Sequence, residues 1–116
     1  MGRLLGGFET VLLFAVLELE GDAHGVSIRR LIEERTGRTT SPGAVHTALD
    51  RLQKRNLVES STADSPPARG GRPRRFYRLT PAGTLALRES HTAVLKMAEG
   101  VAPRLSDLPG AQEVDA

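Results

Sequence analysis

Two helix starts of the same kind divide this chain and restrict the folds open to it. Ser41-Pro42 and Thr80-Pro81 each put a hydroxyl at the capping position and a proline at the first helical position, where a missing N–H is tolerated. Between the two helices, residues 57–61 and 75–79 have the length and composition of short strands. We therefore expect a small β-hairpin between two helices.

Two further helices are predicted before residue 41. Residues 8–20 are apolar on several faces, and their length favours a helix that ends at Gly21. A second helix, capped by Asp22, runs to about Thr36 and ends before Gly37. The third, from Ser41 to near Asn56, has an apolar stripe at helical spacing, made of Val45, Ala48, Leu49 and Leu52.

The predicted order is helix, helix, helix, strand, strand, helix, with a short turn between the second and third helices. That order predicts a helix-turn-helix followed by a hairpin, which is the plan of a winged helix. The fold class is mainly α with a small β-hairpin. The chain has 116 residues. We assign the winged helix-turn-helix to residues 1–80, a dimerisation helix to 81–103 and a flexible tail to 104–116.

Charge is concentrated in the connection between the strands. The chain has a formal net charge of only +2, but five arginines fall between Arg69 and Arg78 with no acid among them. The "GRPR" at 71–74 is similar to the core of an AT-hook, whose extended arginines bind a narrow minor groove. A solvated loop is the alternative, but a basic segment beside a helix-turn-helix favours DNA contact by Arg69, Gly71, Arg72, Arg74 and Arg75.

The third helix has the composition of a recognition helix. A helix that enters the major groove needs small or polar residues at its N-terminal end and positive charge along its flank. A solvated amphipathic helix would show the same stripe, so this pattern alone leaves both readings open. The residues predicted to contact DNA here are Thr39, Thr40, Ser41, Gly43, Ala44, His46, Thr47 and Arg51.

The last helix has more apolar residues than a small helical core and a hairpin can cover. Because monomers rarely leave such a stripe in water, we expect a twofold dimer in preference to a helix folded back on its own domain. The predicted dimer residues are Phe8, Leu12, Leu87, Val94, Met97 and Val101.

Several functional classes are unsupported by the sequence. There is no cysteine, and no paired acids or metal-ligand spacing accompany the three histidines, so no enzyme, cofactor or metal is predicted. The apolar run "VLLFAVL" is too short to span a membrane, and no membrane partner is expected. We interpret the chain as cytoplasmic. An RNA-binding protein that uses "RGG" and a winged-helix adaptor for protein contacts remain as alternatives.

Three stretches in this order resemble PadR-type transcriptional regulators: "LEGDAHGVSI", "SPGAVHTALDRLQKRNLVES" and "GGRPRRFYRLTPAG". The single helix after the hairpin is similar to the compact branch of that family. The resemblance implies a winged-helix homodimer that represses transcription from palindrome-like operators in double-stranded DNA. In many members a small molecule releases the DNA, so an effector of unidentified chemistry is implied as a further partner.

Two positions depart from the family pattern. The family usually has an aromatic residue where this chain has Val26, and a tyrosine that contacts the DNA backbone where it has His46. A histidine hydrogen-bonds a phosphate more strongly when it is protonated. We therefore expect DNA affinity to rise as the pH falls through the range in which histidines titrate.

Overall fold

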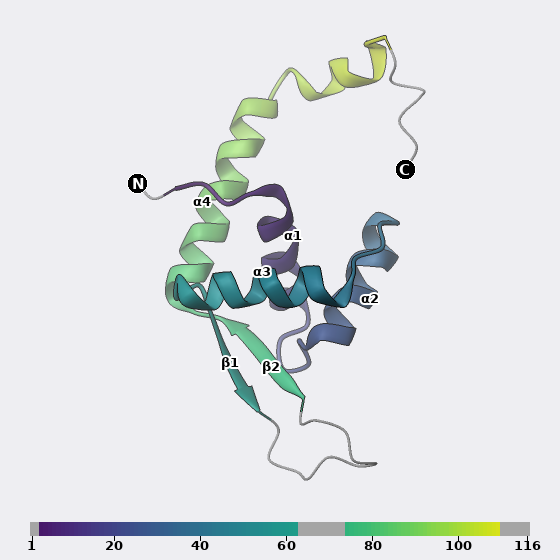
Figure 1. Cartoon of the computed structure of the whole chain (residues 1–116). Helices are drawn as coiled ribbons and strands as arrows, with labels where there is room; N and C mark the ends of the chain where they lie inside the picture. The colour runs from purple at the N-terminus through teal and green to yellow at the C-terminus, as the bar shows by residue number, and fades with distance from the viewer. Residues whose placement is uncertain (1–2, 63–73, 110–116) are drawn as a thin grey trace.

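Four α-helices and one hairpin follow each other in the predicted order. The computed structural model describes residues 3–62 and 74–109 of the chain. The elements are α1 (Gly7–Glu18), α2 (Gly25–Thr36), α3 (Pro42–Lys54), β1 (Val58–Thr62), β2 (Arg75–Leu79), α4 (Pro81–Ala98) and the 3₁₀ helix η2 (Ala102–Asp107) (Figure 1). This mainly α arrangement confirms the predicted fold class.

The two predicted hydroxyl caps, at Ser41 and Thr80, are present in the structure. Ser41 Oγ accepts from the N–H of Ala44 at 3.0 Å, and Thr80 Oγ1 accepts from the N–H of Gly83 at 2.9 Å. Gly37 ends α2 in the left-handed conformation, with φ of 73°. Asn56 takes the same region after α3, with φ of 62°. Local sequence therefore determines where these helices start and stop.

Several boundaries differ from the prediction. Helix α1 covers Gly7–Glu18 rather than residues 8–20. The capping position of α2 is His24 and not Asp22, because Ser27 Oγ accepts from the N–H of His24 and donates to the carbonyl of Asp22. Strand β1 lies one residue later than predicted. After α4, Gly100 reverses the chain with φ of 75°, and η2 occupies part of the segment assigned to the tail.

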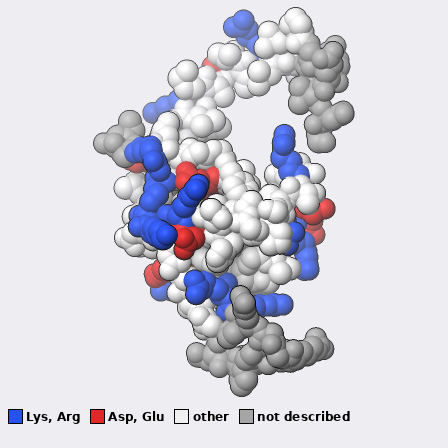
Figure 2. All heavy atoms as spheres, viewed as in Figure 1, with Lys and Arg blue, Asp and Glu red and all other residues white. Residues whose placement is uncertain are grey.

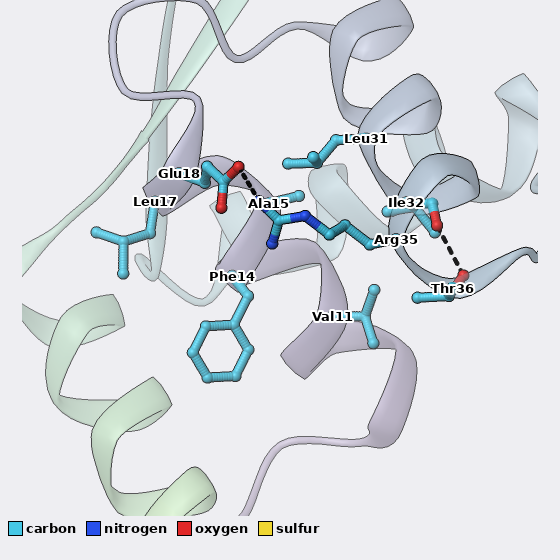
Figure 3. Close-up of a pocket in the computed structure, with 9 residues that line it drawn as sticks. All are labelled: Val11, Phe14, Ala15, Leu17, Glu18, Leu31, Ile32, Arg35 and Thr36. Carbon is cyan, nitrogen blue, oxygen red and sulfur yellow. Dashed lines mark hydrogen bonds and ion pairs between the residues drawn. The ribbon is translucent and has the colours of Figure 1, made fainter.

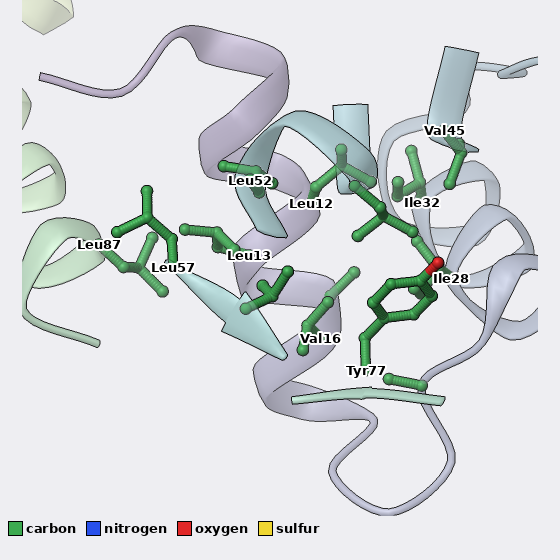
Figure 4. Packing of buried hydrophobic residues seen from close by; sticks show 14 of the residues in the cluster. Leu12, Leu13, Val16, Ile28, Ile32, Val45, Leu52, Leu57, Tyr77 and Leu87 are labelled. Atoms are coloured by element: carbon green, nitrogen blue, oxygen red, sulfur yellow. The ribbon is translucent and has the colours of Figure 1, made fainter. Parts of the chain in front are cut away.

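The core surrounds α1. Leu12, Leu13 and Val16 are fully buried, and they meet side chains from α2, α3, the hairpin and α4 (Figure 4). Two predicted dimer residues belong to this core: Leu12 is 0 % exposed and Leu87 is 4 % exposed. Assigning them to the dimer surface was wrong, because both are covered by their own chain.

One strand of the hairpin, β2, is hydrogen-bonded to the segment that precedes α2. Its strands are antiparallel, with Ser60 opposite Tyr77. The N–H of Tyr77 donates to the carbonyl of Ala23 at 2.8 Å, and the Tyr77 side chain is buried in the core. Strand β2 is thereby joined to the segment that leads into α2.

A glycine allows α4 to pack closely on the start of the hairpin. Gly83 lies in the first turn of α4, and a Cβ added there would lie 1.9 Å from the carbonyl oxygen of Leu57. The same carbonyl accepts from the N–H of Thr80 at 3.1 Å, and the Thr80 hydroxyl donates to the carbonyl of Asn56. The clash would be with backbone atoms, so no side-chain rotation relieves it.

We predict that Gly83→Ala lowers the free energy of unfolding by about 3 kcal/mol, because the helix must move away from Leu57. Gly43→Ala is the matched control, since a Cβ there meets nothing within 4 Å. In a helix, that change is expected to be neutral or to stabilise by up to about 1 kcal/mol. Urea unfolding at one fixed protein concentration measures both, and equal effects of the two variants would contradict the prediction.

Candidate nucleic-acid interface

The exposed surface of the N-terminal half of α3 is formed by small or polar side chains. Val45 and Leu49 turn into the core, whereas Gly43, Ala44, His46 and Thr47 are exposed to solvent. Of the residues predicted to contact DNA from this region, the exposed ones are Thr39, Ser41, Gly43, Ala44, His46, Thr47 and Arg51. The structure therefore brings seven of the eight to one exposed stretch.

Thr40 is the exception. Its hydroxyl oxygen is buried, and within the described residues it has no hydrogen-bond partner, so this atom is not available to DNA. Its carbonyl instead accepts from Nε of Arg29 at 3.0 Å, which fixes the turn between α2 and α3. The prediction for Thr40 is corrected accordingly: it anchors the turn through its backbone.

Basic side chains gather at two places on the side of the molecule that shows α3. Figure 2 shows one group over the C-terminal end of α3, mixed with acidic side chains, and another beside the end of the hairpin. Pairing explains part of the first group, since Lys54 Nζ lies 3.2 Å from Asp50 Oδ2. In the hairpin, Arg78 pairs with Glu59 across the strands at 3.2 Å.

Three arginines at these places have no ion-pair partner within the described residues: Arg51, Arg74 and Arg75. All three are exposed. Unpaired arginines are the groups best suited to a phosphate, because no internal carboxylate must be displaced. The predicted residues Arg69, Gly71 and Arg72 lie outside the described residues.

A hollow of about 310 Å³ joins α3 to the hairpin. Its polar lining comes from His24 and Arg29 of the α2 region, His46 of α3, and Arg74 and Arg75 at the start of β2. The sequence analysis missed His24 and Arg29 as parts of this surface. No local signal marks them, because His24 and Arg74 are fifty positions apart in the chain.

Other kinds of site receive no support from the described residues. Among residues 3–62 and 74–109, no group of three or more histidine, cysteine, aspartate or glutamate side chains is placed to hold a metal ion. None of the helices in these ranges is both long enough and apolar enough to cross a membrane.

Comparison with known proteins decides the family. The family model described as "Transcriptional regulator PadR-like family" matches residues 13–89, which include α3 and the hairpin. This chain belongs to the PadR-like family. Its resemblance to that family, inferred from three sequence stretches, is confirmed.

Relatives of this PadR-like chain include the transcriptional regulator Rv3488 of Mycobacterium tuberculosis, which is 34 % identical over 84 residues, or 71 % of this chain and 72 % of the relative. The structure of a putative transcriptional regulator, TA0346 of Thermoplasma acidophilum, matches with a TM-score of 0.67 at 24 % identity, over 94 % of this chain and 95 % of that one. A PadR family regulator from Clostridium difficile R20291 matches with a TM-score of 0.64 at 26 % identity, over 84 % and 97 %.

These matches establish a transcriptional regulator with a DNA-binding winged helix, and not an enzyme. His46 is exposed on α3 and lines the hollow beside Arg74 and Arg75, so its ring lies on the surface that carries the unpaired arginines.

We predict that His46→Ala weakens DNA binding roughly fivefold, because it removes an exposed hydrogen-bonding ring from the surface that carries the unpaired arginines. Fluorescence anisotropy with one duplex at constant ionic strength measures this. His91→Ala is the control, since His91 packs edge-on against Phe14, with ring centres 5.1 Å apart, and does not line the hollow. Unchanged affinity for His46→Ala, or an equal loss in both variants, would rule the idea out.

Proposed function

We propose that this PadR-like protein is a cytoplasmic homodimeric repressor that binds a specific palindrome-like operator. In this proposal α3 enters the major groove, and the wing, defined as the hairpin β1–β2 and its connection, contacts phosphates or the adjacent minor groove. The observation that carries the proposal is that the unobstructed face of α3 lies on the same surface as the unpaired Arg51, Arg74 and Arg75.

The shape of α3 supports major-groove entry. Gly43 and Ala44 are exposed in its first turn, so the helix backbone is able to approach the base edges closely. His46 and Thr47 follow on the exposed surface and provide hydrogen-bonding groups. Ser41 Oγ is already engaged as the cap, so Ser41 contributes chiefly by its position at the helix N-terminus, where a phosphate is favoured.

The arginines support backbone contacts on both sides of that helix. Arg51 lies toward the C-terminal end of α3, whereas Arg74 and Arg75 lie where the wing begins. Contacts of this kind orient a protein on the duplex, and base contacts then select the sequence. We include the arginines at 69 and 72 in the proposal on the sequence pattern alone.

Dimer formation is supported by a seam along α4. Gly83, Leu87 and Ser90 are buried against the same chain, and their spacing of four and three residues continues to Val94 and Met97. Those two are 62 % and 80 % exposed, because α4 extends past the rest of the chain (Figure 1). A second copy would cover the exposed half of the seam.

Helix α1 offers apolar surface for the same partner. Phe8, Phe14 and Leu17 are each more than a third exposed although they flank the core. Figure 3 shows Phe14 and Leu17 on one side of a groove between α1 and α2, with Arg35 reaching across it to Glu18. The groove has a volume of about 440 Å³ and an apolar floor that includes Leu31.

The dimer explains how a small domain reads an operator. Two copies related by a twofold axis present two α3 helices, so the operator would carry two half-sites of the same symmetry. A protein held on such a site next to a promoter would block transcription, which is the repressor part of the proposal. A small-molecule effector is included on the family resemblance alone.

We predict that the protein binds a duplex from its own upstream region on the order of a thousandfold more tightly than a scrambled duplex. Anisotropy at two or more salt concentrations tests this. Equal binding to both duplexes would contradict a specific operator upstream of the gene. Preference for single-stranded RNA would favour the RNA-binding alternative, and absence of binding would favour the adaptor.

Arg75→Ala should weaken binding and reduce the slope of log K against log salt by about one, as expected for one lost phosphate contact. Arg78→Ala is the matched control, because Arg78 lies in the same strand but pairs with Glu59. An unchanged slope for Arg75→Ala, or the same change for both variants, would exclude Arg75 as a phosphate contact.

Met97→Glu should raise the dimer dissociation constant by roughly tenfold or more, because it places a charge in an apolar contact. Thr92→Glu is the control: Thr92 is exposed in the same helix but lies off the seam. Sedimentation velocity over a concentration series measures both. A wild-type protein that stays monomeric, or a Met97→Glu variant that still dimerises normally, would contradict this surface.

A further inference from the structure

We propose that His24 is a positioning residue for the wing: its neutral ring accepts a hydrogen bond from Arg74 and holds that guanidinium at the junction of α2 and β2. The inference rests on the proposed use of Arg74 in DNA binding, and it adds a residue that does not itself contact DNA.

The side chains of Arg74 and His24 lie within hydrogen-bonding distance of each other. Arg74 Nη1 lies 3.4 Å from His24 Nε2. A guanidinium has only donors and does not lose its proton in proteins, so Nε2 must be the acceptor. An imidazole with a free Nε2 carries its proton on Nδ1 and is neutral. The contact therefore selects one protonation state and one tautomer of His24.

The imidazole ring of His24 is held in place by its surroundings. His24 is only 7 % exposed, and its ring meets Phe76 edge-on with centres 5.5 Å apart. The backbone on either side is held as well, because Ala23 accepts from the N–H of Tyr77 and His24 donates its own N–H to Ser27. A fixed acceptor can fix the direction of a long, exposed side chain such as Arg74.

Burial and nearby charged side chains act on the pKa of His24. Burial and the positive charges of Arg74 and Arg30 lower the pKa of His24, and Asp22, whose Oδ1 lies 3.7 Å from Nε2, opposes them. The other charged or titratable groups that line the adjoining hollow are Arg29, His46, Arg75 and Tyr77. Since the pKa is lowered in the folded state, the stability tied to neutral His24 is present above about pH 6.5 and is lost as the pH falls below it.

The functional consequence lies in the cost of ordering Arg74. A free arginine loses side-chain entropy when it binds a phosphate, whereas one already held by its Nη1 loses less. Its remaining N–H groups are still able to donate to a phosphate oxygen. His24 would thus increase affinity through Arg74 only, and not through the neighbouring Arg75.

The first test needs no DNA. NMR titration of the histidine rings, assigned with single His→Gln variants, gives the pKa of His24 in the full chain. Arg74→Ala should shift that pKa upward, and Arg75→Ala should shift it less. The same pKa in Arg74→Ala and the wild type, or an equal shift in both variants, would overturn the proposal.

The second test is a double-mutant cycle in DNA affinity, with a fluorescein-labelled duplex from the gene's own upstream region. His24→Ala should weaken binding roughly fivefold in the wild type and less than about twofold in Arg74→Ala, but keep its full effect in Arg75→Ala. His24→Gln, whose side-chain oxygen can accept from Arg74 without titrating, should restore affinity and remove the loss of thermal stability below about pH 6.5.

A purely structural His24 would give the same loss in both arginine backgrounds, which would overturn the proposal. If His24→Ala does not fold, the His24→Gln comparison and the titration still decide it. If no variant and no wild-type protein binds the duplex while the titration shift is present, the proposed function is contradicted and the contact between His24 and Arg74 stands.

Discussion

The burial of α1 governs both the fold of this chain and the surface that it leaves open. Leu12, Leu13 and Val16 of α1 are almost completely buried. They pack against α2, α3, the hairpin and α4, which surround α1. Burying apolar area is the main favourable contribution to folding, and a chain of this size has room for only one such centre. α1 is also apolar beyond its buried face, which leaves Phe14 and Leu17 half-covered.

The same division occurs along α4. Its N-terminal half is held by a close backbone contact at Gly83 and by Ser90 Oγ, which accepts from the N–H of Leu5 at 2.9 Å. Its C-terminal half continues the apolar face at Val94 and Met97, which are largely exposed. One helix thus provides intrachain packing at one end and, in our proposal, packing between subunits at the other.

Sequence predicted what is local and missed what depends on partners distant in the chain. The caps at Ser41 and Thr80 and the stop at Gly37 were predictable, because each follows from a few neighbouring residues. Leu12 and Leu87 were assigned to the wrong surface because helical periodicity identifies a buried face but not whether the same chain or a second copy covers it. The carbonyl of Thr40 accepts from Arg29, eleven positions away, and no local sequence pattern predicts this contact.

Helix α2 holds the parts of the proposed DNA-binding surface together, although no pattern in its sequence predicts this role. From α2, Arg29 holds the turn before α3 through the carbonyl of Thr40, and from its capping position His24 meets Arg74 of the wing. A groove-reading helix and a basic wing select DNA only if their separation is constant, since both must fit one duplex at once. In our proposal α2 keeps that separation constant, because Arg29 contacts the turn before α3 and His24 contacts Arg74. We therefore expect a change at either residue to alter DNA recognition without removing a group that contacts DNA.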